Sequence, residues 1–259
     1  MSDASSSEAH VVLREVSLAF GRRRVFDGLS CSFPRGAISV ILGGSGAGKS
    51  TVLRLIGRLQ RPDRGEIFVA GQEITRLSDR RVNEVRGRLG MMFQGGALLD
   101  SLSVFENVAL PLREREHRGD VAQEVRRRLE AVGLPDAGPL LPSQLSGGMV
   151  KRVALARALV GDPEIVLCDE PFSGLDPVNV RRVEALLERL ARDLGITLIV
   201  TSHHIASSRR MAEQIVFLQD GRAVVGTPAE LEASPDRRIG DFFRADGEGP
   251  FTLPEGAAA

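Results

Sequence analysis

Apolar and polar residues alternate near the start of the chain, after ten small or polar residues that we expect to be frayed. The alternation runs from Val11 to Phe33 and is clearest in the segments Val12–Val16 and Leu29–Phe33. A period of two places one set of side chains on a buried face of a sheet. This region therefore predicts antiparallel strands.

Continuous apolar runs follow, separated by turns and by helical patterns. The run Ile38–Leu42 predicts a buried strand, and Val52–Ile56 predicts a helix that continues to about Leu59. After the turn Pro62–Gly65 comes a short strand, Glu66–Gly71. Later elements are strands at Glu164–Cys168 and Ile196–Val200, a helix from about Val178 to Leu194, and a strand pair, Ile215–Leu218 and Ala223–Val225, joined by the turn Gln219–Arg222.

The pattern changes between about Leu99 and Val160, where helical spacing dominates. Val121, Val125, Leu129 and Val132 recur every three or four residues, with arginines on the other side. Strands that alternate with helices imply a mostly parallel α/β sheet, here interrupted by a helical insertion. We find no internal repeat.

Composition places the chain among ordinary globular proteins. Its 259 residues are 42% hydrophobic and 26% charged, and its formal net charge is zero, so no global field points to nucleic acid. The arginine clusters at 22–24, 126–128 and 209–210 are expected to lie on solvated faces.

Other features of the sequence indicate a cytosolic protein. No apolar run approaches the ~18 residues of a membrane helix. The start Met1–Ala4 lacks the basic and apolar parts of a signal peptide. Cys31 and Cys168 lie in apolar strand contexts and are interpreted as small buried side chains.

A glycine-rich segment stands between the strand Ile38–Leu42 and the helix that begins near Val52. Strand, glycine-rich turn and helix form the context of a phosphate-binding loop, in which backbone N–H groups converge on an anion. Lys49 would reach the β- and γ-phosphates, and Ser50 would hold Mg²⁺. The alternative is a simple glycine-rich turn with an exposed lysine. The predicted nucleotide-binding residues are Gly43, Gly44, Ser45, Gly46, Ala47, Gly48, Lys49, Ser50 and Thr51.

Two carboxylates end the strand Glu164–Cys168. Asp169 could hold Mg²⁺ through water, and Glu170 could polarise an attacking water. The alternative is an ordinary strand that ends in acidic loop residues. Together with the phosphate loop, the pair predicts hydrolysis of a nucleoside triphosphate.

The segment Leu145–Met149 precedes Lys151, Arg152 and an apolar helix. Ser146 is placed as a helix cap, while Gly147 and Gly148 leave backbone N–H groups accessible to a phosphate. With the other motifs in this order, the segment resembles the signature of ATP-binding cassette (ABC) ATPases, over roughly residues 11–228. The resemblance implies an α/β fold, a P-loop NTPase of the ABC ATPase type. This type has a mostly parallel sheet core, an antiparallel β subdomain and a helical subdomain at about 99–160, within a domain of residues 1–240.

The resemblance also implies roles for single residues. Phe20 resembles the aromatic residue that stacks on adenine; the alternative is an aromatic residue at a strand edge. Gln94 resembles the glutamine that reaches the metal and senses the transmembrane partner. His203 resembles the switch histidine that contacts the γ-phosphate, and Ser173–Asp176 resembles the loop that crosses between subunits. His204 departs from the family, which usually has Asp there.

ABC ATPases work in pairs. A lone phosphate loop leaves one side of the γ-phosphate open, and Ser146, Gly147 and Gly148 of the opposite subunit would close it. The resemblance therefore implies a second copy of this chain, with ATP and Mg²⁺ held between the two copies.

Three features resemble the ATPases of Mla-type (MCE-associated) phospholipid transporters. They are Met149 after the signature glycines, the segments Phe93–Leu99 and Val104–Glu114, and the tail from Asp241. This resemblance implies a separate permease, an MCE-domain protein, a small STAS-like subunit and a place on the cytoplasmic face of the inner membrane. It implies no nucleic-acid partner. The lipid species and the direction of transport stay open.

Two alternatives to lipid transport share the ATP motifs. An importer for amino acids or other small solutes would differ only in its partners. A DNA-repair or ribosome-associated cassette would carry a long coiled-coil insertion or two cassettes, and one motif set in 259 residues fits neither.

The tail 241–259 is expected to form a C-terminal extension. Its phenylalanines, Phe242, Phe243 and Phe251, would gain free energy from burial. They are therefore expected to dock either on this chain's own core or, as the resemblance suggests, on the neighbouring ATPase subunit.

Overall fold

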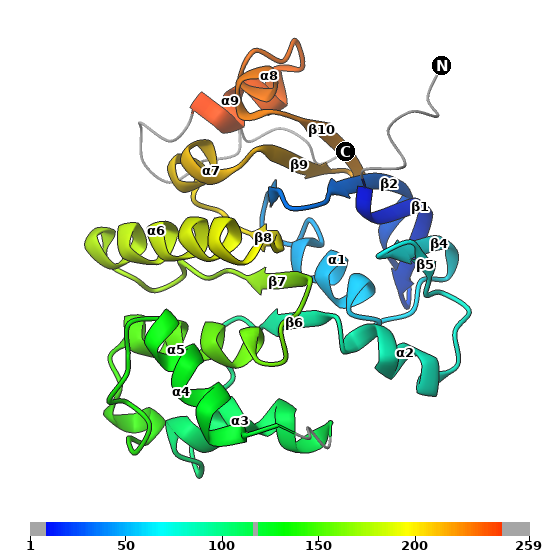
Figure 1. Ribbon diagram of the computed structural model, residues 1–259. Coiled ribbons are helices and arrows are strands. Elements are labelled where there is room, and N and C mark those ends of the chain that lie inside the picture. Colours follow the sequence, from blue (N-terminus) through cyan, green and yellow to red (C-terminus); the bar gives the residue numbers. More distant parts are fainter. Residues whose placement is uncertain (1–8, 116–118, 245–259) are drawn as a thin grey trace.

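The structure is a computed structural model that describes residues 9–115 and 119–244. Its centre is a six-stranded sheet with the order β10-β9-β3-β8-β7-β6 (Figure 1). All neighbouring strands in it are parallel except β9 and β10, which pair antiparallel at one edge. The strands are β3 (Ile38–Gly43), β6 (Leu89–Met92), β7 (Ile165–Asp169), β8 (Thr197–Thr201), β9 (Gln214–Gln219) and β10 (Arg222–Gly226).

A second sheet is antiparallel and has the order β2-β1-β4-β5. Its long strands β1 and β2 cover the region of alternating residues, so the predicted antiparallel part is confirmed. The strands are β1 (Ala9–Phe20), β2 (Arg23–Pro34), β4 (Arg64–Val69) and β5 (Gln72–Glu73).

Helices cover both faces of the parallel sheet (Figure 1). The first one, α1, lies between the two sheets, and most of the others lie on the opposite face. The helices are α1 (Lys49–Ile56), α2 (Asp79–Arg86), α3 (Val104–Glu114), α4 (Val121–Ala131), the 3₁₀ helix η1 (Pro142–Gln144), α5 (Gly147–Leu159), α6 (Pro177–Leu194), α7 (Ile205–Met211), α8 (Pro228–Glu232) and α9 (Arg237–Arg244).

The strand β7 shows how the core is divided. Ile165 and Leu167 pack with α1 and the antiparallel sheet, while Val166 and Cys168 pack with the helices on the other face. Because both faces are covered, the strand is apolar at consecutive positions, as is typical of parallel sheets. Burial raises the pKa of the Cys168 thiol to about 12, which agrees with an inert packing role.

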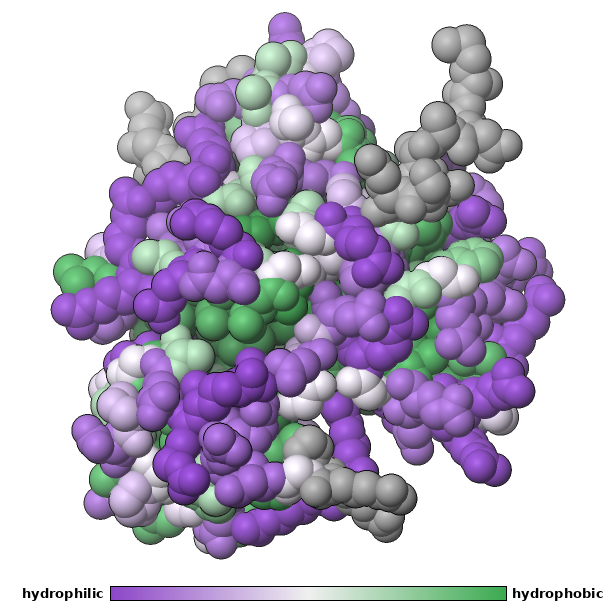
Figure 2. Space-filling model, in the orientation of Figure 1, coloured by the Kyte–Doolittle hydropathy of each residue, from purple (hydrophilic) through white to green (hydrophobic). Residues whose placement is uncertain are grey.

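The helices α3, α4, η1 and α5 fall within the region where helical spacing was predicted, and they form a separate lobe (Figure 1). A capping box fixes the start of α3, where the Ser103 side chain accepts from the Glu106 N–H and the Glu106 carboxylate accepts from the Ser103 N–H. On the face in Figure 2, hydrophilic residues dominate the surface. Hydrophobic residues show mainly in the hollow between this lobe and α6.

The C-terminal part corrects the prediction about the tail. The helix α9 runs across residue 240, so the predicted start of an extension at residue 241 falls inside it. Phe243 is fully buried in this chain's own core, and the ring of Phe242 lies 4.9 Å from that of Phe217. Docking on a neighbouring subunit is therefore wrong for Phe243, because Ile239 and Phe243, four residues apart, share the buried face of α9. Phe251 lies outside the described residues.

Several predicted solvated arginines are engaged in specific contacts. Arg128 is buried, and its guanidinium pairs with Glu124 at 2.7 Å and with Asp162 at 2.5 Å. Arg209 donates to the carbonyl oxygen of Phe243 and thereby holds α9 against α7. In the two described ranges we find no helix with the length and hydropathy that crossing a membrane requires.

Candidate nucleotide site

The loop from Gly43 to Gly48 joins β3 to α1, as predicted. Gly43 and Gly48 have φ values of 149° and 98°, which disfavour other residues. A Cβ atom on Gly48 would lie 2.6 Å from Cζ of Phe26, and one on Gly43 would lie 2.6 Å from the carbonyl oxygen of Leu218. Glycine therefore lets the loop pack closely against both sheets.

The helix α1 begins at Lys49, and no side chain caps its first turn. Its first N–H groups and the positive end of its dipole therefore point toward the loop, where they favour an anion. The Lys49 ammonium donates to the carbonyl oxygens of Gly43 at 2.9 Å and Gly44 at 3.3 Å. The lysine thus arches back over the loop.

Asp169 ends β7 and lies next to the start of α1, 119 residues away in the sequence. Its Oδ1 atom accepts hydrogen bonds from Ser50 Oγ at 2.8 Å and from Thr201 Oγ1 at 2.7 Å. Two of the three predicted metal residues, Ser50 and Asp169, are therefore in direct contact. A hydroxyl and a carboxylate are ligands suited to a hard cation such as Mg²⁺.

Glu170 follows in an uncommon backbone conformation. Its φ of 48° lies in the left-handed region, which costs energy for a residue with a side chain. Its N–H donates to Thr201 Oγ1 at 2.9 Å, and its Oε2 atom lies 2.7 Å from Nδ1 of His203. The buried Lys151 donates to its carbonyl oxygen at 3.3 Å, and burial lowers the pKa of this lysine against the opposing effect of the nearby carboxylates. The backbone of Glu170 is thus held by Thr201 and Lys151, and its carboxylate is held by His203.

A cavity of about 430 Å³ lies over the phosphate loop. Phe20 at the end of β1, Gln94 in the loop after β6, and Glu170 all line it together with Ser45–Thr51. Phe20 is half exposed, which leaves its ring open to a ligand. The structure therefore brings the predicted adenine residue, most of the phosphate loop and two of the metal residues to one cavity. Asp169 and His203 do not line it but contact Ser50 and Glu170, which do.

The signature residues lie elsewhere. Ser146 caps α5, as predicted, since its Oγ atom accepts from the N–H of Met149 at 3.3 Å. Gly147 and Gly148 form the first turn of α5, and none of the three residues lines the cavity. Within one chain the signature therefore does not meet the phosphate loop.

The segment Ser173–Asp176 lies beside the signature. Asp176 caps α6 and accepts from Nδ2 of Asn179 at 2.5 Å. A Cβ atom on Gly148 would lie 3.3 Å from Oδ1 of Asn179. Asn179 therefore packs against the signature glycine and sets the distance between the two segments. Asn179 carries no motif of its own and was not among the predicted site residues.

His204 packs against neighbours on two sides. Its ring lies 4.5 Å from that of His203, and it meets the buried Phe172 edge-on at 6.1 Å. This histidine, whose role the sequence leaves open, therefore lies beside the predicted switch histidine.

Three more residues of the site were missed from the sequence. Thr201 and Lys151 contact the two carboxylate residues, as described above, and Arg23 donates to the carbonyl oxygen of Gly46 at 3.2 Å. Thr201 could have been found from its position, because a polar residue that ends an apolar strand is a candidate for a site at the edge of the sheet. Arg23 was hidden in the run 22–24, where a solvated face was expected.

Comparison with known proteins agrees with this geometry. The family model described as ABC transporter matches residues 26–173. A dimeric ATP-binding cassette solved in a post-hydrolysis state, bound to ADP and Pi, superposes with a TM-score of 0.77 at 31% identity, covering 84% of this chain and 98% of the other. The chain belongs to the ABC transporter family, and its fold is that of the family's ATPase.

Two curated relatives bear on the kind of transporter. The intermembrane phospholipid transport system ATP-binding protein MlaF of Escherichia coli (strain K12) is 43% identical over 251 residues, which cover 95% of this chain and 93% of the relative. The methionine import ATP-binding protein MetN of Haemophilus influenzae (strain ATCC 51907 / DSM 11121 / KW20 / Rd) is 40% identical over 219 residues, which cover 84% of this chain and 64% of the relative.

Proposed function

We propose that this chain is the ATP-binding and ATP-hydrolysing subunit of a transporter that moves phospholipids between membranes and powers a separate permease. The observation that carries the proposal is the contact of Glu170 with His203 in a site that also holds Lys49, Ser50 and Asp169. The near full-length similarity to the phospholipid transport relative supports the choice of cargo.

Each residue of the site has a role in hydrolysis. Lys49 and the N–H groups of α1 bind the phosphates, and Phe20 stacks on the adenine. Glu170 orients a water for attack and takes its proton, and His203 holds the γ-phosphate. The left-handed backbone conformation of Glu170 then serves catalysis, because it directs the carboxylate toward the phosphate loop.

Mg²⁺ fits the oxygen ligands at the end of β7. Ser50, Asp169 and Gln94 would hold it, and it would neutralise charge on the phosphates when bound. The hydrogen bond from Thr201 to Asp169 fixes the carboxylate from behind, as outer-shell partners of metal ligands commonly do.

A second copy completes the site. Ser146 and Gly147 are exposed at the start of α5, away from the cavity of their own chain. In a head-to-tail pair, Ser146, Gly147 and Gly148 of one copy close the phosphate site of the other. The dimeric cassette of known structure supports this arrangement.

The permease docks in an apolar groove of about 320 Å³ between β6 and α3. Phe93 and Leu99 both line it and are 38% and 46% exposed, so the groove presents two large apolar side chains to a partner. Since Gln94 follows Phe93, a permease segment in this groove would act directly on a residue of the ATP site. The chain would thereby lie at the cytoplasmic face of the inner membrane, with an MCE-domain protein and a small STAS-like subunit in the same complex.

Import of a small solute is the alternative, favoured by the similarity to the methionine importer. The two functions predict different cargo for the same ATPase. The deciding experiment is to purify the chain with its permease from detergent-solubilised membranes and reconstitute the complex in liposomes. We expect ATP-dependent transfer of a fluorescent phospholipid, and none from the complex carrying Glu170→Gln. Uptake of methionine without phospholipid transfer would contradict the proposal.

The groove has its own test in the same purification. Leu99→Asp should release the permease and leave ATP binding intact, because a buried, unpaired carboxylate disfavours apolar docking. Val224→Asp is the control, since Val224 is 41% exposed on β10, outside the groove. Equal recovery of the permease with both variants would argue against docking in the groove.

A further inference from the structure

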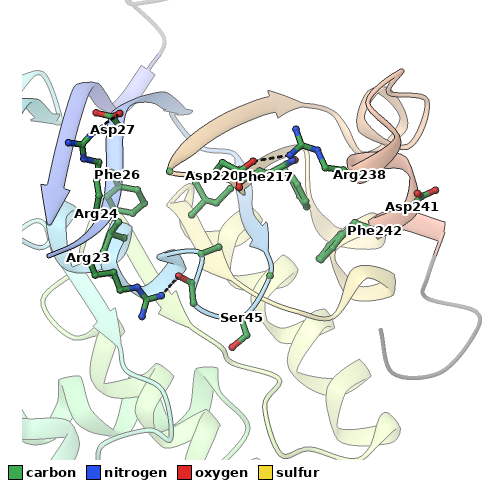
Figure 3. Close-up of a pocket in the computed structure, with 17 residues that line it drawn as sticks. Arg23, Arg24, Phe26, Asp27, Ser45, Phe217, Asp220, Arg238, Asp241 and Phe242 are labelled. Atoms are coloured by element: carbon green, nitrogen blue, oxygen red, sulfur yellow. Dashed lines mark hydrogen bonds and ion pairs between the residues drawn. The ribbon is translucent and has the colours of Figure 1, made fainter. Parts of the chain in front are cut away.

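A cleft of about 800 Å³ adjoins the phosphate loop, of which residues 44–47 line it (Figure 3). The loop, the start of β2, the β9–β10 turn and α9 form its walls, and Arg23, Arg24 and Arg238 line it. Two of these arginines pair with carboxylates, Arg24 with Asp27 at 2.9 Å and Arg238 with Asp220 at 2.9 Å.

Arg23 differs from the other two arginines. Its Nη2 atom donates to the carbonyl oxygen of Gly46, in the middle of the phosphate loop, and Figure 3 shows the side chain turned toward that loop. Within residues 9–115 and 119–244, no carboxylate lies within 4.0 Å of its guanidinium. Its charge is therefore not neutralised by a neighbouring acid in the described part of the chain.

The position of Arg23 follows from its strand. Arg23 and Arg24 are consecutive at the start of β2, so their side chains leave opposite faces of the sheet. Arg24 turns to Asp27, while Arg23 turns to the loop and lines the nucleotide cavity as well as the cleft. The charged side chains that line the nucleotide cavity are Arg23, Lys49 and Glu170.

We propose that Arg23 is a second phosphate-binding cation of the nucleotide site. A guanidinium has five N–H donors, and its fork matches the oxygens of a phosphate. The bond to Gly46 holds the fork beside the loop that wraps the phosphates, at a different part of the loop from Lys49. Arg23 therefore contacts the phosphate chain of the bound nucleotide. This inference rests on the nucleotide site proposed above.

The test compares four variants of the full chain by competition with a fluorescent ATP analogue, in the presence of Mg²⁺. The competitors are ATP, ADP and inorganic pyrophosphate, which lacks base and ribose. Arg23→Gln should weaken all three by roughly 10- to 100-fold, the range of a charge-assisted hydrogen bond. Arg24→Gln, the matched neighbour on β2, should bind all three like the wild type.

Two further measurements separate phosphate binding from bracing of the loop. Raising the ionic strength should shrink the difference between wild type and Arg23→Gln, because salt screens an exposed charge. Arg23→Lys should recover part of the affinity by keeping the charge. A loss that salt does not change, together with a lower Tm of the nucleotide-free protein, would show that Arg23 only braces Gly46 and would overturn the proposal.

Lys49→Ala separates this inference from the site itself. If Lys49→Ala weakens binding and Arg23→Gln leaves the affinity for pyrophosphate unchanged, only the role of Arg23 is refuted. If Lys49→Ala also binds like the wild type, the nucleotide site fails, and the inference fails with it.

Discussion

The two ends of the parallel strands carry similar polar residues in different surroundings. At the carboxyl ends of β7 and β8, Asp169 and Thr201 contact each other beside the nucleotide cavity. At the amino ends, Thr197 bonds to His10 at 2.6 Å, and Glu164 takes two hydrogen bonds from Arg88 at 2.6 and 2.8 Å. The first set lies beside a cavity for a ligand, whereas the members of the second set bond mainly to one another.

This difference distinguishes polar residues that take part in catalysis from those that stabilise the fold. Ligands of open parallel sheets bind at the carboxyl ends of the strands, where loops and helix N-termini meet. The amino ends have no phosphate loop, so their polar groups serve to join β1 to the central sheet. We therefore expect changes at the carboxyl ends to reduce turnover, and changes at the amino ends to reduce stability.

The largest effect is expected from Glu170→Gln at the carboxyl end. The amide keeps the shape but cannot accept a proton, so ATP hydrolysis should fall by roughly 10²- to 10⁴-fold while ATP binding persists. Phosphate release and binding of a fluorescent ATP analogue measure the two properties. Hydrolysis at the wild-type rate would refute the role of Glu170.

The second effect concerns dimerisation, which involves the site at the carboxyl ends of the strands and not the amino ends. With ATP, the Glu170→Gln chain should form dimers, because uncleaved γ-phosphate holds two copies together. Adding Ser146→Arg should return it to monomers by placing bulk and charge where the copies meet. Light scattering provides the readout, and dimers that persist in the double variant would contradict the proposed pairing.

The smallest effect is a dependence of stability on pH at the amino ends. Hydrogen bonds from Arg88 lower the pKa of Glu164 from 4.5 to about 2, and burial lowers the pKa of His10 below 6.5. Each shift means that the unfolded chain takes up the proton first, so protonation of either group lowers the stability of the fold as the pH falls. The loss of stability from His10 begins as the pH falls below 6.5, and the loss from Glu164 occurs between about pH 4.5 and pH 2.

Chemical denaturation across this range measures the effect, with Glu164→Gln as the comparison. Between about pH 4.5 and pH 2, the Glu164→Gln variant should lose less stability than the wild type. Identical pH profiles would show that the Glu164 network contributes nothing.

The sequence predicted the elements that carry local patterns. The strand β3, the loop after it and the end of β7 each combine an apolar run with a chemical motif, so both fold and candidate residues could be derived there. The resemblance to the ABC family added Phe20, Gln94 and His203, which have no local pattern of their own. Their roles stay predictions until variants are measured.

Other elements depend on contacts between distant segments and could not be predicted. The strand β6 contains Gly90, where a Cβ atom would lie 2.0 Å from the carbonyl oxygen of Ala158, so α5 dictates this glycine. Arg23 and Arg128 looked alike in arginine runs, yet one reaches the phosphate loop and the other is buried in ion pairs. Only the folded chain distinguishes them.

The central claim is that the carboxyl ends of the strands serve catalysis and the amino ends serve structure. Strand β8 offers a matched pair, since Thr201 and Thr197 are both fully buried at its two ends. Valine keeps the shape and removes the hydroxyl, so each change to valine should cost about 1–3 kcal/mol of stability.

The most direct test measures ATP hydrolysis and Tm of Thr201→Val and Thr197→Val side by side, well below both melting temperatures. We predict a similar loss of Tm in both variants. Hydrolysis should fall by roughly 10- to 100-fold only in Thr201→Val, because Asp169 loses the hydroxyl that orients it. Equal hydrolysis rates in the two variants would contradict the account.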